Sequence, residues 1–336
     1  MARLVSFGLL AAFAIVFAGC VQAGAREGDP DLPEGFGSVL PAAPLGGYIY
    51  MSLGGEPMSI AEGIVAPDGT LLRIKGDVET MSIWLGPFDV DGFSAIAARV
   101  RFPNQTGATI ALDKLNQTET SSSLWTRQRG VALDLVLGDG VSAVDIIIAL
   151  TNDLYVNGDR SARVATNTLQ SFPRQPNQRV LGAGWVQFTP RLMPVALRAL
   201  AKQGWPDLQP VTGLLSQSGV KHVVFAVYGD SVPDVIRPSE VAGALAGQGT
   251  DVLFATDTTL PAPLLSLTFN VGAQRLGLTP VRLSSGRGFV YRADGLSTVA
   301  RTQGGTIFAS LSTSEASAKD LLGRVGSRPP PRSESR

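Results

Sequence analysis

The feature that most constrains the fold is a series of short runs rich in β-branched and aromatic residues, separated by glycine, proline and aspartate. Such runs are typical of strands, because these side chains pack well on a pleated, half-buried surface. The chain is therefore expected to build at least one sheet. The runs expected to be strands are Tyr48–Leu53, Phe93–Phe102, Val131–Leu137, Val144–Leu150, Gly182–Phe188, His222–Tyr228, Val252–Ala255 and Thr306–Leu311.

Two segments carry the signals of helix ends. Thr189-Pro190 is expected to lead into a helix over Leu192–Gln203, since proline suits the first turn of a helix. Ser312 is followed three residues later by Glu315, a capping-box pattern that predicts a helix ending at Gly323. Hairpins interrupt what would otherwise be a regular alternation of strand and helix. The pattern therefore predicts an α+β fold of mixed, hairpin-containing sheets covered by short helices.

A weak internal similarity suggests that the domain has two similar halves. Residues 106–140 match residues 271–305 at a constant offset of 165, with five identities in 35 columns. Glycines around a strand, turn and strand are where backbone geometry outlasts sequence drift. The alternatives are a duplication, with halves at 46–172 and 180–326 joined near 170–179, and coincidence in a glycine-rich chain. The matched residues are Gly107-Ala108 with Gly272-Ala273, Arg127 with Arg292, Gly130 with Gly295 and Gly140 with Gly305.

The sharpest local expectation is a hairpin over residues 131–150. Asp139-Gly140 favours a two-residue type I′ turn. This turn would place Leu135 and Ile146 on one buried face together with the other aliphatic side chains of both strands. The same register would put Asp134 directly across from Asp145 on the other face.

Two opposed carboxylates destabilise a strand pair unless water, an arginine, a cation or a shared proton compensates them. One interpretation is a dyad of Asp134 and Asp145 for acid–base catalysis or calcium binding. The alternative is two hydrated side chains with Arg127 or Arg129 nearby. Asp134 and Asp145 are thus the only candidate catalytic residues.

The composition removes several classes of function. Lysine plus arginine equals aspartate plus glutamate at 28 each, which argues against nucleic acid as a partner. Cys20 is the only cysteine and His222 the only histidine, so cysteine or histidine clusters for a metal cannot form. No nucleophile elbow and no phosphate-binding glycine loop is present. We expect no cofactor and no metal.

The first residues have the organisation of an export signal. Met1-Ala2-Arg3 precedes an apolar run, Leu4–Phe17, that is too short to span a bilayer, and small residues follow it. Phe17-Ala18-Gly19-Cys20 resembles the lipobox of bacterial lipoproteins, with phenylalanine where that family prefers leucine. In that family the cysteine receives a diacylglyceryl thioether, the leader is cut before it, and the new amino terminus is acylated, commonly with palmitate. The resemblance implies a signal peptide at 1–19 and lipidation at Cys20.

The resemblance also sets the expected location and partners. Residues 20–45 are expected to form a flexible tether and residues 327–336 a disordered tail, because both are rich in proline and polar residues. The protein is expected on the outer membrane if the organism has one, and otherwise on the outer face of the cytoplasmic membrane. The sequence favours a non-enzymatic envelope protein that binds a protein or small ligand. The alternatives are the solute-binding lipoprotein of a transporter and an envelope hydrolase using Asp134 and Asp145.

Overall fold

The computed structural model describes a large part of the chain between residues 22 and 325. The expected signal peptide, Cys20, the helix at 192–203 and the tail at 327–336 lie outside the described residues, as does most of the tether. The described residues are 22–23, 38–39, 47–52, 58–60, 64–65, 71–72, 76–85, 95–117, 123–138, 140–154, 156–157, 168–169, 171–173, 179–187, 222–229, 251–275, 278–293 and 295–325.

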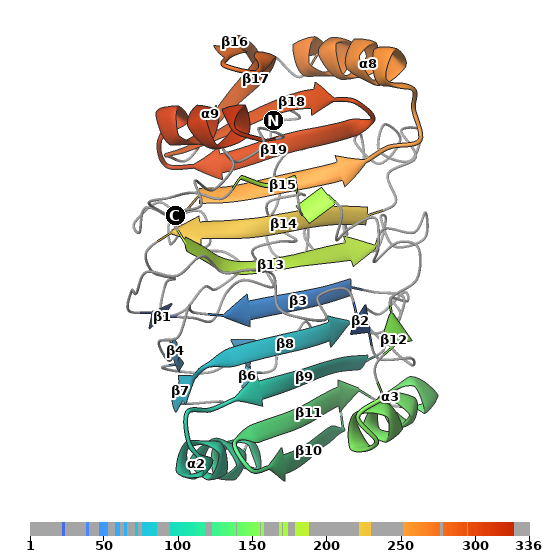
Figure 1. The fold of residues 1–336 in the computed structure, drawn as a ribbon, viewed down its shortest axis with the longest axis vertical. Helices are drawn as coiled ribbons and strands as arrows, with labels where there is room; N and C mark the ends of the chain where they lie inside the picture. Colours follow the sequence, from blue (N-terminus) through green and yellow to red (C-terminus); the bar gives the residue numbers. More distant parts are fainter. Residues whose placement is uncertain are drawn as a thin grey trace, which may run out of the picture.

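The main element is a twelve-stranded sheet with the order β10-β11-β9-β8-β3-β13-β14-β15-β19-β18-β17-β16 (Figure 1). Every pairing in it is antiparallel. The strands are β3 (Gly47–Ser52), β8 (Thr80–Leu85), β9 (Ala95–Arg101), β10 (Leu124–Arg129), β11 (Ala132–Gly138), β13 (Arg179–Gln187), β14 (His222–Gly229), β15 (Asp251–Asp257), β16 (Thr279–Leu283), β17 (Gly286–Ala293), β18 (Leu296–Gln303) and β19 (Thr306–Ser312).

Smaller pairings and four helices accompany this sheet among the described residues. The helices are α2 (Gln105–Leu115), α3 (Val141–Thr151), α8 (Ala262–Arg275) and α9 (Glu315–Gly323). The short strands are β1 (Gln22–Ala23) with β4 (Met58–Ile60) and β7 (Gly76–Val78), β2 (Ser38–Val39) with β12 (Val156–Asn157), and β5 (Ile64–Val65) with β6 (Leu71–Leu72). Two dipeptides of the expected tether are thus paired into strands. No helix among the described residues is long and apolar enough to cross a lipid bilayer.

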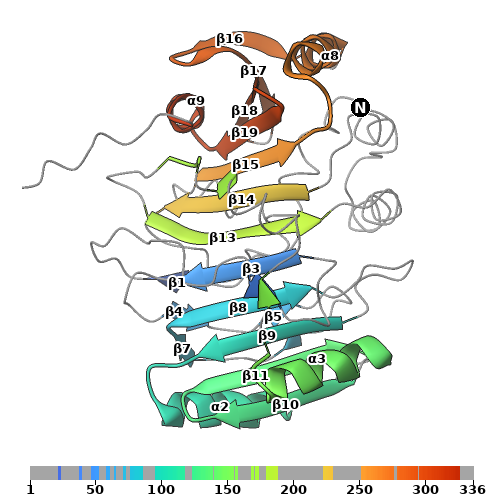
Figure 2. The ribbon, with the colours of Figure 1, turned by 45° about the vertical axis from the view of Figure 1, so that its right-hand side comes forward.

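The helices cover both faces of the sheet, with α2 and α3 at one end and α8 and α9 at the other (Figure 2). On one face, Ile146 of α3 and Leu321 of α9 belong to a single buried cluster that spans both ends of the sheet. On the other face, Thr109 of α2 accepts a hydrogen bond from Gln128 of β10 at 3.1 Å. The α+β class predicted from the sequence is confirmed.

Most expected strands are confirmed, but the run at 144–150 is not a strand. It belongs to α3, which begins after Gly140, so the hairpin turning at Asp139-Gly140 is wrong. Gly140 has a φ of 81° as the residue before the helix. Ala143, Ile146 and Leu150 are buried, a spacing of three and four that matches one face of a helix. Packing of this face overrides the β preference of the run.

The last helix is confirmed with a correction at its start. Ser314, not Ser312, precedes the helix, and its hydroxyl accepts a hydrogen bond from the backbone N–H of Ser317 at 3.3 Å. The Ser312 hydroxyl instead accepts from the backbone N–H of Ser314 at 3.0 Å. The hydroxyl groups of the two serines therefore stabilise successive turns of the backbone. Glu315 is the first helical residue.

The two ends of the sheet have equivalent topology. β9 is followed by α2, the hairpin β10–β11 and α3, and β11 pairs with β9. β15 is followed by α8, a meander that ends with the hairpin β18–β19, and α9, and β19 pairs with β15. Gly130 and Gly304 occupy the two hairpin turns with φ values of 58° and 60°.

The strand registers are equivalent as well. Asp134 lies opposite Arg99 and Arg127, and Phe308 lies opposite Ala255 and Arg301 in the same arrangement. The halves meet where β3 pairs with β13, with Ile49 opposite Gly184. Following the registers outward from this pair reaches Leu135 on one side and Ala309 on the other by the same steps, so the preceding residues Asp134 and Phe308 are equivalent. An approximate two-fold axis therefore passes through the β3–β13 pairing.

The structural equivalence differs from the offset of 165 found in the sequence. Equivalent residues of the two hairpins β10–β11 and β18–β19 are 174 positions apart, as for Asp134 and Phe308. Equivalent residues of β9 and β15 are 156 positions apart, as for Arg99 and Ala255. The extra residues of the second half form β16 and β17, which have no counterpart in the first. The offset of 165 would place α3 on β19. Duplication itself stays a prediction.

The helical assignment of residues 141–151 gives the first testable prediction. In a strand, residues 144, 146 and 148 would share one face, but here Ile146 is fully buried while Val144 is 53% exposed. Replacing Ile146 with Ala should lower the free energy of unfolding by about 2–5 kcal/mol. Val144→Ala is the matched control and should change it by no more than about 0.5 kcal/mol. Urea unfolding measures both, and equal losses would contradict the helix.

Candidate functional site

The residues singled out in the sequence are distributed over separate elements. Asp134 lies on β11 and is fully buried, whereas Asp145 lies on the exposed side of α3. They do not face each other across a hairpin, because Asp145 is helical. His222 is the first residue of β14. Cys20 lies outside the described part of the chain.

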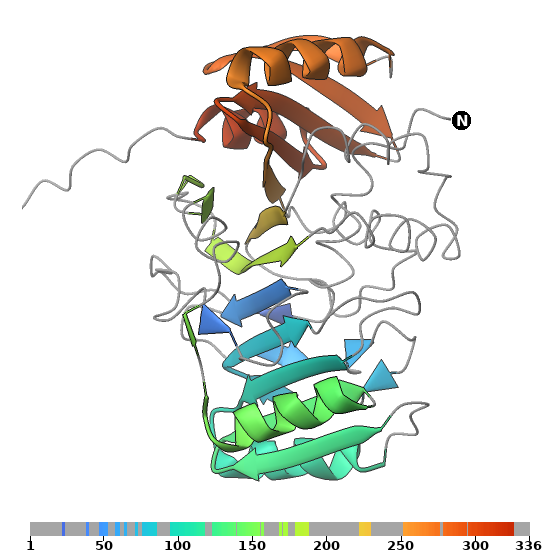
Figure 3. The same ribbon diagram turned by 90° about the vertical axis from the view of Figure 1, so that its right-hand side faces the viewer.

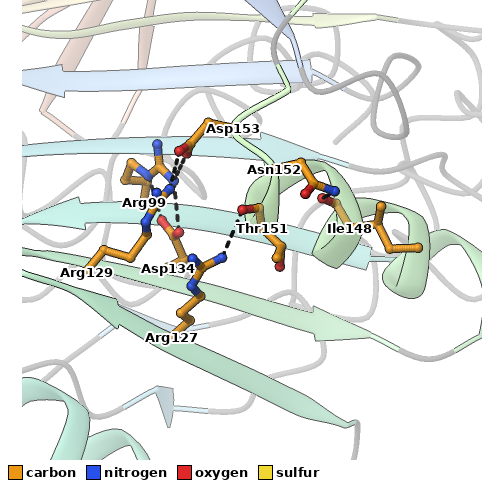
Figure 4. Close-up of polar contacts among 8 residues, drawn as sticks. All are labelled: Arg99, Arg127, Arg129, Asp134, Ile148, Thr151, Asn152 and Asp153. Atoms are coloured by element: carbon orange, nitrogen blue, oxygen red, sulfur yellow. Dashed lines mark hydrogen bonds and ion pairs between the residues drawn. The ribbon is translucent and has the colours of Figure 1, made fainter.

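Asp134 is compensated by an arginine of the neighbouring strand. Arg99 of β9 donates from Nε to Oδ1 at 2.6 Å and from Nη2 to Oδ2 at 2.8 Å, so both carboxylate oxygens are used (Figure 4). The two residues are direct cross-strand neighbours. This bidentate geometry is the strongest arrangement for an arginine and a carboxylate. An arginine had been expected as one possible compensation, but Arg99 supplies it and not Arg127 or Arg129.

A second carboxylate connects this pair to the end of α3. Asp153 accepts from Arg99 Nη2 at 3.1 Å and forms a short ion pair with Arg129 (Figure 4). The hydrogen bond from Arg129, followed by that from Arg99, holds the pKa of Asp153 below its usual range. Asp153 has a φ of 50°, a backbone conformation that aspartate tolerates better than most residues. The charges therefore fix the chain where it leaves the helix.

Arg127 contacts the helix itself. Its Nη1 donates to the carbonyl oxygen of Thr151 at 3.1 Å, at the C-terminal end of α3 (Figure 4). In the second half, Arg301 Nη2 donates to the carbonyl oxygen of Val325 just after α9, also at 3.1 Å. A cation is favourable at this end of a helix, where carbonyl groups lack partners within the helix. The two arginines are equivalent in topology and have the same structural role.

The comparison of the halves shows that the fold does not require the ion network. Where the first half has Arg99 and Asp134, the second has Ala255 and Phe308 at the same register positions. Arg301 lies 5.9 Å above the Phe308 ring and is only 3% exposed. Burial lowers the pKa of Arg301. The first half thus has an ion pair at two register positions that the second half fills with apolar residues.

The first half also differs on the outer surface of α3. Val141, Val144 and Ile148 form a stripe along the helix with exposed fractions of 77, 53 and 50%. The outer surface of α9 instead carries the ion pair of Lys319 with Glu315 and the pair of Arg324 with Asp320. α8 exposes a similar apolar stripe, Leu264, Leu267 and Val271. These two helices lie at opposite ends of the sheet (Figure 3).

An open depression lies at the other end of the sheet. It is lined by residues of the hairpin β16–β17, among them Arg282, Ser284 and Arg287. Sequence reasoning missed this depression, because its arginines come together only through the strand register. Arg99 could have been suspected as the partner of Asp134, because a buried carboxylate needs a cation. Arg99 lies within an expected strand, on the same face as Ala97 and Arg101.

The described residues contain no group of three histidine, cysteine or acidic side chains placed to hold a metal ion. No protein-family model, no curated protein and no solved structure matches this chain significantly.

The buried pair of Arg99 and Asp134 gives a second prediction. Asp134→Asn should lower the free energy of unfolding by roughly 3–5 kcal/mol, because a partly buried guanidinium loses its main partner. Asp145→Asn, an exposed residue of the same kind, should change it by no more than about 0.5 kcal/mol. Thermal and urea unfolding measure both variants.

A double variant tests the cause of this loss. Arg99→Ala with Asp134→Phe installs the residues of the second half at the same register positions. It should be more stable than Asp134→Asn, since replacing a buried ion pair by apolar residues is often neutral. A double variant less stable than the single one would contradict the equivalence of the two sites.

Proposed function

We propose that this chain is a lipid-anchored binding protein of a bacterial cell envelope, facing away from the cytoplasm, that acts without catalysis. The observation that carries the proposal is the state of Asp134. Both of its oxygens accept hydrogen bonds from Arg99, and Asp145 stands apart on the surface of α3. An acid–base mechanism needs two groups set against each other, one with a tuned proton affinity. The pair considered for that role is not assembled in this arrangement.

The anchor is the second part of the proposal. Cys20 follows a short apolar leader within a lipobox-like sequence and is the only cysteine of the chain. A diacylglyceryl group on its sulfur with an acylated amino terminus would give at least two chains in the bilayer. Two chains are what stable anchoring requires, since one chain binds only marginally.

The alternative functions have less support. A transporter's solute-binding lipoprotein is expected to have lobes built on parallel, doubly wound sheets. The described strands of this chain pair antiparallel in every case. A carboxylate-dependent hydrolase would need Asp134 to leave Arg99. The exposed apolar side chains of α3 and α8 are the kind of surface that favours association with a partner.

The anchor is tested by fractionating cells that express the wild type or Cys20→Ser. The wild type should be found in the membrane fraction, and its amino-terminal peptide should carry the mass of the lipid. The variant should keep its leader and lack the lipid mass. A wild-type protein whose mature amino terminus is not Cys20, or carries no lipid, would contradict the anchor.

The non-catalytic part is tested with Asp145→Asn in place of the wild-type gene. This variant should remain folded and abundant, and should behave as the wild type wherever a deletion strain shows a defect. Unfolding curves recorded in parallel establish that the variant is folded, so that a defect cannot be attributed to loss of folding. A folded, anchored Asp145→Asn protein that reproduces the deletion would favour the hydrolase.

A further inference from the structure

The hairpin β16–β17 is the element that breaks the equivalence of the two halves. In the first half the strand order ends with β10, whose counterpart in the second half is β18. The second half continues past this point with β17 and β16, which form the end of the sheet. The first half completes the equivalent topology without such strands, although Leu283 of β16 and Val290 of β17 add to the buried core of the second half.

Two arginines lie directly opposite each other on this hairpin. Arg282 of β16 pairs in register with Arg287 of β17, and both side chains are exposed. Opposed like charges destabilise a strand pair. Among the exposed arginines that the structure describes, these two have no carboxylate partner. The other exposed arginines form ion pairs, Arg101 with Glu79, Arg129 with Asp153, and Arg292 with Glu315.

Protection of a sheet edge does not account for the pair. Charged side chains and proline on an edge strand discourage pairing with another chain, which suits Pro280 and Arg282 of β16. β17, however, is an inner strand, paired on one side with β16 and on the other with β18. Arg287 precedes the residues of β17 that pair with β18, and its one cross-strand neighbour is Arg282, so protection of the outer edge of β16 does not require it.

The backbone beneath the arginines is closely packed. A Cβ at Gly288 would lie 2.7 Å from Leu283 Cδ1 and 2.9 Å from the carbonyl oxygen of Ala300, so only glycine fits there. Arg287 lies 5.5 Å above the ring of Phe289, which contacts Phe269 of α8 edge to face at 5.8 Å. The two strands are thus held in place, and Arg287 is supported by an aromatic ring. The pair of charges therefore lies on a closely packed strand pair.

We infer that Arg282 and Arg287 bind a phosphate group, with Ser284 in the same depression as a further donor. A phosphate would replace the repulsion of the two guanidinium groups with two attractive contacts. Guanidinium groups match the oxygens of phosphate with pairs of parallel hydrogen bonds. The phosphate can come from the headgroup of an anionic lipid or from a soluble phosphate ester. The inference names the ligand chemistry of the proposed binding function but does not depend on the lipid anchor.

The test uses the purified full chain in non-ionic detergent micelles and measures binding by titration calorimetry. The probes are inorganic phosphate, glycerol 1-phosphate, and micelles doped with phosphatidylglycerol or, for comparison, phosphatidylcholine. The wild type should bind at least one of inorganic phosphate, glycerol 1-phosphate and the phosphatidylglycerol micelles. Arg282→Gln with Arg287→Gln should weaken that binding roughly tenfold or more, since both charge-assisted contacts are lost.

Arg292→Gln is the matched control. It removes an exposed arginine from the same strand, but one that is already paired with Glu315. It should leave binding within about twofold of the wild type, because the contacts of the proposed site remain. The double variant should unfold at the same temperature as the wild type or higher in phosphate-free buffer, since a repulsion is removed. This measurement separates loss of the site from loss of the fold.

The outcomes distinguish the sources of the phosphate. Binding of the soluble probes without preference for phosphatidylglycerol supports a soluble phosphate ester. Binding of phosphatidylglycerol micelles alone supports a lipid headgroup. No binding of any probe, or equal losses in the double variant and Arg292→Gln, would overturn the inference. Such a result would leave the anchor and the non-catalytic function untouched, because neither rests on the hairpin.

Discussion

The backbone hydrogen bonds between β3 and β13 join the two halves into one sheet, with Ile49 opposite Gly184. Each of these strands also pairs with the next strand of its own half, β8 or β14. Without the pairing, each half would end in a strand with unpaired N–H and C=O groups, which invites association with other chains. The pairing of β3 with β13 thus supplies hydrogen-bond partners to the inner edge of both halves. The buried cluster that runs from Trp84 to Val325 then packs across the joint.

The approximate symmetry about this joint makes differences between the halves informative. The same strand register holds a buried ion pair at Arg99 and Asp134 in one half, and Ala255 with Phe308 in the other. The ion pair serves local structure, since it connects β9 and β11 to Asp153 after α3. The apolar stripe of α3 and the opposed arginines of the hairpin β16–β17 have no such use within the described chain. Features that the shared fold does not need are the most reasonable places to look for binding.

Strands were predictable from the sequence where burial and composition agree, as in Phe93–Phe102 and His222–Tyr228. The segment 144–150 was mistaken for a strand because its β-branched residues fit both periods, and the buried set Ala143, Ile146 and Leu150 shows only in the packed structure. The contact of Asp134 with Arg99 depends on a long-range register that sequence spacing does not encode. The equivalence of the halves was obscured for a similar reason, because the inserted hairpin shifts the alignment partway through.

The central claim is that the two halves form one cooperative sheet through β3 and β13. Native-state hydrogen exchange tests it most directly, using the amides of Ala98 in β9 and Phe254 in β15, which occupy equivalent positions. In one cooperative unit, both amides should exchange through global unfolding, with the same opening free energy and the same dependence on denaturant. If one amide exchanges through a smaller opening while the other stays protected, the halves open independently and the account is wrong.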